Sequence, residues 1–565
     1  MLRKATSFVS YLACCTAMFV HPLDATLAQQ PKTIRELSAD VIIAGGSTAA
    51  LAAAIASADS GATTVLIEPT DWIGGQLTSS GVPPVDEAWH KIRNESTGEI
   101  TLDVAKIARD PRNMPPFLRD ALMEIGNPGR GWVSRFCYQP KILLKNHLEP
   151  EVNRLSNRLL ILRETVVKEL EIDGRRLLAI EAIRRTSRHP ERGYANLPSE
   201  AIPDWYSREP SEQFDKEIIQ ISGNESVVFI DATEWGELLA LSGRSYLQGV
   251  EHREGSLEGD DRCGQSIVFG FSQKLHVAPA NDRAPDAQAT GLGFGKFEER
   301  PEAWQKIWTY RRLLGKGSGP TAGDITLQNW GYEPSAENGG NDYPFGYIFF
   351  SRKDTAASIG DWQGGVDLKV MADSETRAYA WHEWFKQNAP DKFSPKQITL
   401  HYQVFGTAHG LSKLPYIRDT RRSIGLNDFI LTIDDLIGNG VSKTGTKFAD
   451  RVAIGAYPAD VHFLVRQEYP AHVIEHRDTR PFYIPFRALT HRDFDNLLVA
   501  GKTMAQSFMA NSATRVHPIE WSSGTAAGVI AAFMAEEHKT SRDTLHSIEQ
   551  VQKLVKQRTP IDWSF

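Results

Sequence analysis

A continuous apolar stretch followed by a glycine-rich turn is the strongest hydrophobic pattern near the start of the chain. Residues 39–44 (ADVIIA) are largely apolar and β-branched without alternation, which predicts a strand buried on both faces. Residues 45–50 (GGSTAA) predict a turn, residues 51–60 an alanine-rich helix, and residues 63–67 (TTVLI) a second buried strand. We therefore expect a parallel βαβ unit of about thirty residues.

The middle of the chain changes pattern twice. Residues 159–162 and 177–183 are apolar and flank an Asp-Gly pair at 173–174, which predicts a small antiparallel hairpin inserted into the main fold. Residues 185–222 are polar and proline-rich without a clear period, so we expect an extended loop there. Residues 227–232 (VVFIDA) are continuously apolar up to Asp231, which predicts a return to the parallel sheet.

The C-terminal third repeats the pattern of a buried strand followed by a helix. Residues 495–501 (DNLLVAG) predict a strand that ends in glycine, and residues 524–535 (GTAAGVIAAFMA) predict an apolar helix that starts on small residues. Between the two sheet regions, residues 271–480 are rich in Trp, Gly, Asn and Pro and predict short helices. We expect this region to cover a substrate.

The first 28 residues have the pattern of a signal peptide. A short basic start (Arg3, Lys4) precedes an apolar run over residues 7–20, and Thr26 and Ala28 place small residues where a signal peptidase cleaves. The apolar run is short for a membrane span, although an amphipathic leader or anchor is the alternative. We expect a periplasmic or secreted protein with no stable membrane span after cleavage.

Composition excludes several classes of protein. With 41% hydrophobic and 24% charged residues the chain is neither disordered nor fibrous, and its 565 residues predict more than one domain. A net charge of 63 − 70 = −7 leaves no basic surplus for nucleic acid. After residue 28 only Cys137 and Cys263 remain, enough for one disulfide, and no CxxC or HExxH motif indicates a metal site.

The turn after the first strand has the chemistry of a phosphate site. The pattern GxGxxG stands here as Gly45, Ser47 and Ala50, and Glu68 follows at the end of the second strand. A glycine turn lets backbone approach a pyrophosphate, amides of the helix N-terminus donate to it, and a carboxylate about twenty residues later binds ribose hydroxyls. We expect a dinucleotide on Gly45, Ser47, Thr48, Ala49 and Glu68, with a plain strand–turn–helix as the alternative.

Later glycines favour FAD over NAD as this dinucleotide. Gly74, Gly75 and Gln76 follow Glu68, where flavoproteins pass chain close to the cofactor. Gly501 ends the late strand, and the helix after it begins at the three candidates Gly524, Thr525 and Ala526. A late strand and helix alone would more often belong to the core than contact a cofactor, but together with the βαβ unit they favour FAD.

Seven segments resemble motifs of the FAD-dependent oxidoreductases of the glutathione-reductase-like superfamily, in family order: residues 71–77, 136–140, 230–238, 416–422, 457–462, 483–487 and 496–528. The resemblance implies an α/β fold with a discontinuous Rossmann-like FAD-binding domain in residues 38–270 and 481–540. It further implies an α+β substrate or cap domain in residues 271–480, followed by a C-terminal tail in residues 541–565. Ala232 is then expected near the dinucleotide.

Acid–base candidates are histidines and a tyrosine near the expected flavin. His517 lies between the two C-terminal flavin elements and titrates near neutrality, so it is the first candidate for the base. A loop histidine bonded to backbone is the equally weighted alternative. His462 and Tyr457 form a second group. The chain departs from the resemblance at Phe508, where many relatives carry His near the flavin, as it does at Ser47 in the phosphate turn.

Arg418 is the candidate for binding an anion. It precedes Arg421 and Arg422 on what we expect to be one helical face, where the three could clamp a carboxylate or stabilise an anionic flavin. Solvated charges on a helix are the alternative.

These features together predict an exported FAD-dependent oxidoreductase. We expect it to oxidise a small polar organic substrate by hydride transfer to flavin and to pass the electrons to an unknown acceptor. The alternative is a carbohydrate-active lyase or hydrolase on a flavoprotein-like scaffold, and a binding protein without cofactor is a third class.

Overall fold

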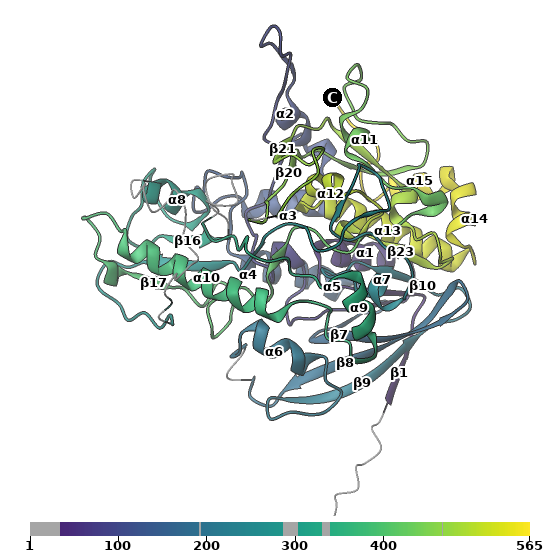
Figure 1. Cartoon of the computed structure of the whole chain (residues 1–565), viewed down its shortest axis with the longest axis horizontal. Helices are drawn as coiled ribbons and strands as arrows, with labels where there is room; N and C mark the ends of the chain where they lie inside the picture. Colours follow the sequence, from purple (N-terminus) through teal and green to yellow (C-terminus); the bar gives the residue numbers. More distant parts are fainter. Residues whose placement is uncertain (1–33, 191–193, 286, 288–302, 330–339, 466) are drawn as a thin grey trace, which may run out of the picture. The chain divides into compact units, whose positions relative to one another are not determined.

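The described part of the protein is residues 34–565, except residues 191–193, 286, 288–302, 330–339 and 466, in a computed structural model (Figure 1). The predicted signal peptide, residues 1–28, lies outside the described residues. Residues 34–565 form one contact unit. The predicted division of this unit at residues 270, 480 and 540 stays a prediction.

A five-stranded parallel sheet carries the predicted βαβ unit. Its order is β23-β10-β2-β3-β6, with β2 (Val41–Ala44), β3 (Thr64–Ile67), β6 (Leu159–Leu162), β10 (Val228–Asp231) and β23 (Leu497–Val499). All residues of β2, β3 and β10 are buried, which explains their unbroken apolar pattern. The sheet confirms four predicted strands, but β6 was wrongly assigned to the hairpin: it pairs with β3 at the edge of this sheet.

Two helices cover this sheet and contact each other closely. Helix α1 (Thr48–Asp59) connects β2 to β3, and α13 (His517–Glu536) crosses it. A Cβ at Gly524 would lie 2.8 Å from Cα of Ala49, and one at Gly528 the same distance from Cα of Ala53. The prediction that this helix starts at Gly524 is wrong, because α13 begins seven residues earlier and Gly524 lies inside it, against α1.

A second sheet contains the predicted hairpin. Its order is β1-β9-β8-β7, with β1 (Ile34–Ser38), β7 (Thr165–Asp173), β8 (Arg176–Ser187) and β9 (Phe214–Ser222). Gly174 turns β7 into β8 with a φ of 56°. The loop expected over residues 185–222 is wrong, since this stretch holds the end of β8, helix α6 (Pro198–Trp205) and β9. The isoleucine-rich residues 218–221 (IIQI) were the local signal for β9.

The region after residue 271 has the α+β character that was predicted. An antiparallel sheet of order β15-β16-β14-β17 is formed by β14 (Phe271–Leu275), β15 (Arg312–Leu314), β16 (Ile325–Gln328) and β17 (Ile398–Leu400). Helices α8 (Trp304–Tyr310) and α10 (Leu368–Gln387) lie beside it (Figure 1). Stacked tryptophans, with Trp304 on Trp308 and Trp381 on Trp384, help to form its core.

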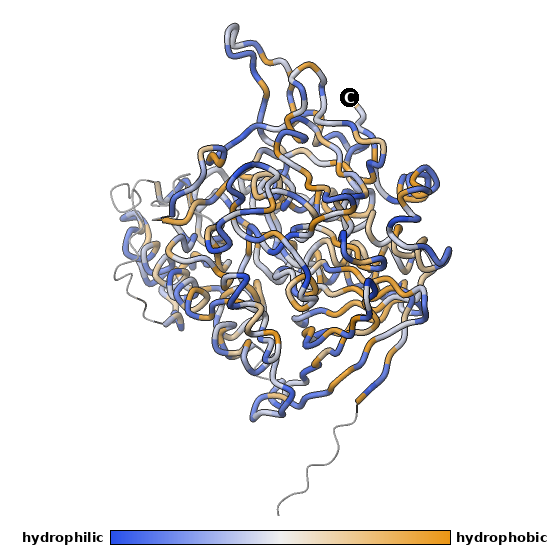
Figure 2. Tube along the Cα trace, turned by 45° about the vertical axis from the view of Figure 1, so that its right-hand side comes forward, coloured by the Kyte–Doolittle hydropathy of each residue, from blue (hydrophilic) through white to orange (hydrophobic). Residues whose placement is uncertain are grey.

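The remaining helices are shorter than α10 and α13. They include α3 (Pro116–Ile125), α12 (Phe508–Thr514), α14 (Ser541–His546) and α15 (Ile548–Val555). The predicted C-terminal tail thus contains two helices, and α15 packs against α13. Hydrophobic segments of the trace gather in the interior, whereas peripheral loops are hydrophilic (Figure 2).

Two further expectations concern cysteines and membranes. Cys137 and Cys263 are both buried and unpaired, so the disulfide that the sequence allowed is not formed. Within the described ranges, no helix combines the length and apolar character that a membrane crossing requires.

Candidate functional site

A cavity of about 700 Å³ brings together three of the four predicted catalytic residues. Arg418 follows strand β18 (Tyr416–Ile417), while Tyr457 and His462 flank β20 (Ala459–Asp460). The remaining wall comes from distant segments: Val82, Asp86, Glu87, Trp89, Arg109, Trp132, Val133, Tyr310, Arg311, Asn329, Tyr416, Asp460, Val461, Glu475, His476 and Arg515. Both positive and negative side chains line this wall, which suits a polar substrate.

An ion-pair network fixes one side of the cavity. Arg418 Nη2 lies 2.8 Å from Asp342 Oδ1, and His462 Nδ1 lies 2.6 Å from Asp342 Oδ2. On its other side His462 Nε2 is 3.3 Å from Asp460 Oδ2, which Arg515 also reaches at 3.3 Å. Burial alone would raise the pKa of Asp342, but Arg418 and His462 hold it below its usual value. Arg418 and His462 are therefore held in place before any substrate binds.

The expected helical face of three arginines is wrong. The arginines follow the two-residue strand β18, and all three are buried. Arg421 donates to the carbonyls of Trp235 and Gly365, and Arg422 pairs with Glu251 at 2.8 Å. Of these three arginines, only Arg418 lines the cavity. Arg421 and Arg422 instead connect separate loops through their hydrogen bonds and ion pair.

Aromatic side chains form the other wall. Trp89 and Trp132 remain 53% and 48% exposed, and Trp132 packs on Tyr310 with ring centroids 4.4 Å apart. Burial raises the pKa of Tyr457 well above its usual value, so this phenol stays protonated at neutral pH. Tyr457 can donate a hydrogen bond to a substrate, but it is a poor base.

His517 does not line this cavity. Its ring is buried, Nε2 lies 2.7 Å from the carbonyl oxygen of Val82, and Nδ1 accepts from the backbone N–H of Asp86 at 3.2 Å. Burial lowers its pKa to about 4. Both ring nitrogens are thus used to hold residues 82–86, which carry part of the cavity wall. The geometry is that of the backbone-bonded histidine, and His517 is a positioning residue.

We expect His517→Ala to lower the free energy of unfolding at pH 7 by about 2–4 kcal/mol, because it leaves two buried backbone groups without partners and opens a hole. The unfolded chain binds the histidine proton near its ordinary pKa and the folded chain does not. The free energy of unfolding of wild type therefore falls as pH falls toward 5. The difference in this free energy between wild type and His517→Ala narrows by about 2 kcal/mol between pH 7 and pH 5.

Urea unfolding at pH 7 and pH 5 measures both effects, with the exposed His546→Ala as control. Equal stability of His517→Ala and wild type at pH 7 would contradict the positioning role.

The predicted phosphate turn is present and covered. Ser47 caps α1 by accepting from Ala50 N–H at 3.1 Å, and its hydroxyl donates to the carbonyl of Ala232 at 2.6 Å. Thr48 donates to the carbonyl of Gly74 at 2.8 Å. A Cβ at Gly75 would lie 2.6 Å from the backbone nitrogen of Thr48, so Gly75 lies directly on the first turn of α1.

Glu68 directly follows β3, at its carboxyl end as expected, but its environment is closed. The side chain is 1% exposed, and Oε1 accepts from the backbone N–H and the hydroxyl of Thr70, both at 3.1 Å. Burial raises its pKa to about 8, and the bonds from Thr70 lower it only in part. Glu68 is therefore mainly protonated at neutral pH in this conformation.

The C-terminal cofactor candidates are also enclosed. Gly501 lies against Ala49 and against Glu520, whose carboxylate pairs with Lys502 at 2.7 Å. Lys502 also reaches Glu234 at 2.9 Å. All thirteen predicted cofactor residues are buried in the described structure: Gly45, Ser47, Thr48, Ala49, Glu68, Gly74, Gly75, Gln76, Ala232, Gly501, Gly524, Thr525 and Ala526.

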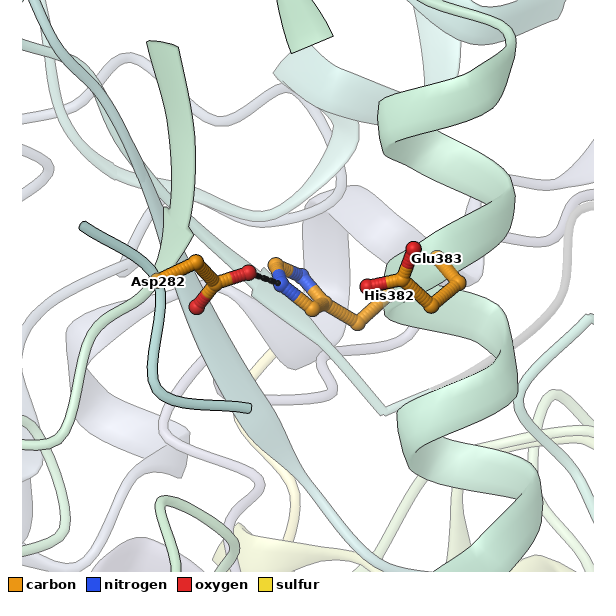
Figure 3. Close-up of side chains that lie close together, drawn as sticks. All are labelled: Asp282, His382 and Glu383. Carbon is orange, nitrogen blue, oxygen red and sulfur yellow. Dashed lines mark hydrogen bonds and ion pairs between the residues drawn. The ribbon is translucent and has the colours of Figure 1, made fainter. Parts of the chain in front are cut away.

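A separate cluster is formed by His382 and Glu383 on α10 and by Asp282, which comes from a neighbouring segment (Figure 3). His382 Nε2 is 2.7 Å from Asp282 Oδ2, and its Nδ1 is 2.7 Å from Gln273 Oε1. The ammonium of Lys386 lies 3.0 Å from Asp282 and 2.6 Å from Glu383. Because the Lys386 ammonium already contacts both carboxylates, we interpret the cluster as a structural ion-pair network.

Several cavity residues were missed in the sequence. Asp460 stands inside the motif that supplied Tyr457 and His462, and Arg515 stands two residues before His517, so both had a usable signal. Asp342 and Asp86 had none, because their roles arise only when distant segments meet.

Comparisons with known proteins give one family. A family model described as FAD dependent oxidoreductase matches residues 40–195 and 216–555. No curated protein matches the chain. Similar solved structures include p-nitrophenol 4-monooxygenase from Pseudomonas putida DLL-E4, at 10% identity and TM-score 0.29 over 93% of this chain and 84% of that chain.

Two others are quinol fumarate reductase from E. coli, at 13% identity and TM-score 0.29 over 92% of this chain and 74% of that chain, and L-proline dehydrogenase from P. horikoshii. The latter has 14% identity and TM-score 0.17, over 40% of this chain and 26% of that chain, so the match spans about a quarter of that enzyme. At these identities and scores the solved structures carry no conclusion about chemistry.

Proposed function

The chain belongs to the FAD-dependent oxidoreductase family, and on this premise we propose that it oxidises a small polar organic substrate in the cavity lined by Arg418, Tyr457 and His462. FAD is the cofactor of this family, and when bound it supplies the redox chemistry. The observation that supports the proposal is the Arg418–Asp342–His462–Asp460 network, which presents charged donors to a polar cavity without needing to rearrange.

The chain's own residues bind and orient the substrate. Arg418, held by Asp342, offers guanidinium N–H groups to a substrate oxygen. His462 lies between two carboxylates, which fix the orientation of its ring, so it suits the exchange of a proton with a substrate hydroxyl or amine. The exposed faces of Trp89 and Trp132 suit the apolar side of a substrate ring.

The cofactor does not fit the described conformation. Gly75 lies on Thr48, where a pyrophosphate would be bound, and Glu68 is bonded to Thr70 instead of facing open space for a ribose. No step is therefore derived through FAD. Hydride transfer from substrate to flavin, with onward transfer to an unidentified acceptor, is the finer form of the proposal.

Export is a further part of the proposal. The basic start, the apolar run and the small residues at 26 and 28 support cleavage after residue 28 and a periplasmic or secreted protein. N-terminal sequencing of the mature protein tests this, and an intact Met1 in the exported fraction would contradict it.

The test of function is a screen of alcohols, amines and aldoses for substrate-dependent reduction of the flavin-loaded protein. On any active substrate we expect His462→Gln to lower kcat by about 10²–10⁴-fold, the usual effect of losing a positioned acid–base group. His546→Gln, on the surface, is the matched control. An unchanged kcat in His462→Gln would show that the reaction does not take place in this cavity.

A carbohydrate-active lyase or hydrolase on this scaffold is the second candidate. The covered phosphate turn favours it, since the Asp342–His462–Asp460 network can move a proton without a cofactor. The visible spectrum of purified protein discriminates the two. A flavin spectrum that bleaches with substrate supports the oxidoreductase, and a colourless protein that cleaves a glycan supports the second candidate.

A further inference from the structure

Two exposed tryptophans line the cavity that contains Arg418 and His462. We propose that Trp89 and Trp132 form an aromatic platform for a carbohydrate, and that the substrate is one sugar unit of a longer saccharide whose neighbouring units lie against these rings. The inference deepens the proposed function. It rests on that function for the reaction but not for the binding.

The cavity has aromatic side chains at its mouth and part of its ion-pair network inside. Of the tryptophans that the structure describes, only Trp89 and Trp132 have about half of their surface exposed, and both line this cavity. The side chains of Arg418 and His462 are only 2% and 13% exposed, so they lie deeper. Exposed apolar surface that is rimmed by polar groups is typical of a ligand-binding groove.

Both indole rings are held in place before a ligand binds. Trp132 Nε1 donates to the carbonyl of Lys306 at 3.3 Å, and its ring packs on Tyr310. The ring of Trp89 packs on His476, with centroids 5.1 Å apart. A side chain that is already ordered loses little conformational entropy when a ligand contacts it. Two fixed and exposed indoles are therefore suited to bind the apolar faces of sugar rings.

The charges of the lining favour a ligand with many hydroxyl groups. Counted without histidines, the lining contains four arginines and four carboxylates, so their charges sum to zero. A surplus of either sign would favour a ligand of the opposite charge. A hydroxyl both donates and accepts, so a polyol can bond to a guanidinium and a carboxylate at once. At Asp86, for example, Oδ1 lies 4.0 Å from Arg311 Nη2, which places both atoms within reach of one bridging hydroxyl.

An amino acid fits this lining less well. It carries one group of each charge, so it would use one arginine and one carboxylate of the eight charged side chains. A saccharide has hydroxyls along its whole length and can place successive rings against separate aromatic side chains. The cavity of about 700 Å³ also has the size that accepts a ligand of several rings.

The experiment measures binding to the full mature chain in the absence of an electron acceptor. A glycan array identifies the saccharide, and isothermal titration calorimetry compares its tetrasaccharide with its monosaccharide. We expect the tetrasaccharide to bind at least about tenfold more tightly, because it adds contacts to two aromatic rings. In Trp89→Ala and in Trp132→Ala we expect this preference to fall by about three- to tenfold.

Two sets of variants serve as controls. Trp89→Phe and Trp132→Phe keep an aromatic ring and should keep most of the preference. Phe565→Ala removes an aromatic side chain that is equally exposed but lies outside the cavity lining, so it should not change the preference.

An array on which no carbohydrate binds would overturn the proposal, and so would selective binding of amino acids. A tetrasaccharide that binds no better than its monosaccharide, or alanine variants with the wild-type preference, would also overturn it. Failure of the proposed function is distinguishable, because binding does not require turnover. A saccharide that binds through Trp89 and Trp132 but never reduces the flavin removes only the oxidation. An amine that reduces the flavin of a protein that binds no saccharide removes only the carbohydrate platform.

Discussion

Replacing Gly524 with alanine is expected to lower the free energy of unfolding by about 2–3 kcal/mol. Helix propensity alone would favour the change by about 1 kcal/mol, since alanine is the better helix former. The opposite sign is expected because a Cβ at this position overlaps the carbonyl oxygen of Ala49 and lies 2.8 Å from its Cα. Those are backbone atoms of α1, so the two helices must separate, and overpacking costs more than propensity gains.

Gly528→Ala should behave in the same way, because its Cβ would meet the backbone of Ala53 one turn further along α1. Gly360→Ala is the matched control, since that exposed glycine has open space where a Cβ would stand. Chemical denaturation measures all three. A neutral or stabilising Gly524→Ala would show that the close approach of α1 and α13 is not needed for the fold.

The main sheet was predictable because its strands are buried on both faces. Continuous apolar runs in residues 41–44, 64–67 and 228–231 can hardly be anything but central parallel strands when glycine turns and a helix lie between them. Strand β6 has an equally apolar sequence, but nothing local distinguishes an edge of this sheet from the hairpin that follows it. Its place is decided by tertiary contacts.

The site was predictable only in part for a similar reason. Arg418, Tyr457 and His462 stand in motifs, and the fold brings them to one cavity. His517 stands in a motif as well, but whether a histidine faces a cavity or backbone depends on which segment packs on it, here residues 82–86. The glycines show the same ambiguity. In the sequence, a glycine that makes room for a cofactor looks the same as one that lets two helices cross closely, and Gly524 lies at such a crossing.

The stability of the protein is expected to depend on pH through Glu68. In the folded chain burial raises the pKa of this carboxyl to about 8, whereas the unfolded chain has its ordinary value near 4.5. Between these values the folded state holds a proton that the unfolded state has released. The free energy of unfolding therefore falls as pH rises from about 4.5 to 8, and a contribution of about 3–5 kcal/mol is lost across that window.

Glu68→Gln removes the titrating group and keeps an oxygen for the two bonds from Thr70. We expect the free energy of unfolding of the variant, relative to that of wild type, to rise by about 3–5 kcal/mol between pH 4.5 and pH 8, because the variant has no proton to lose at this position. Urea unfolding across this range measures the gain, with exposed Glu99→Gln as the control. A constant difference between variant and wild type would mean that Glu68 is ionised and solvated, as a carboxylate open to a ribose would be, and the closed conformation around β3 would then not be the one that dominates in solution.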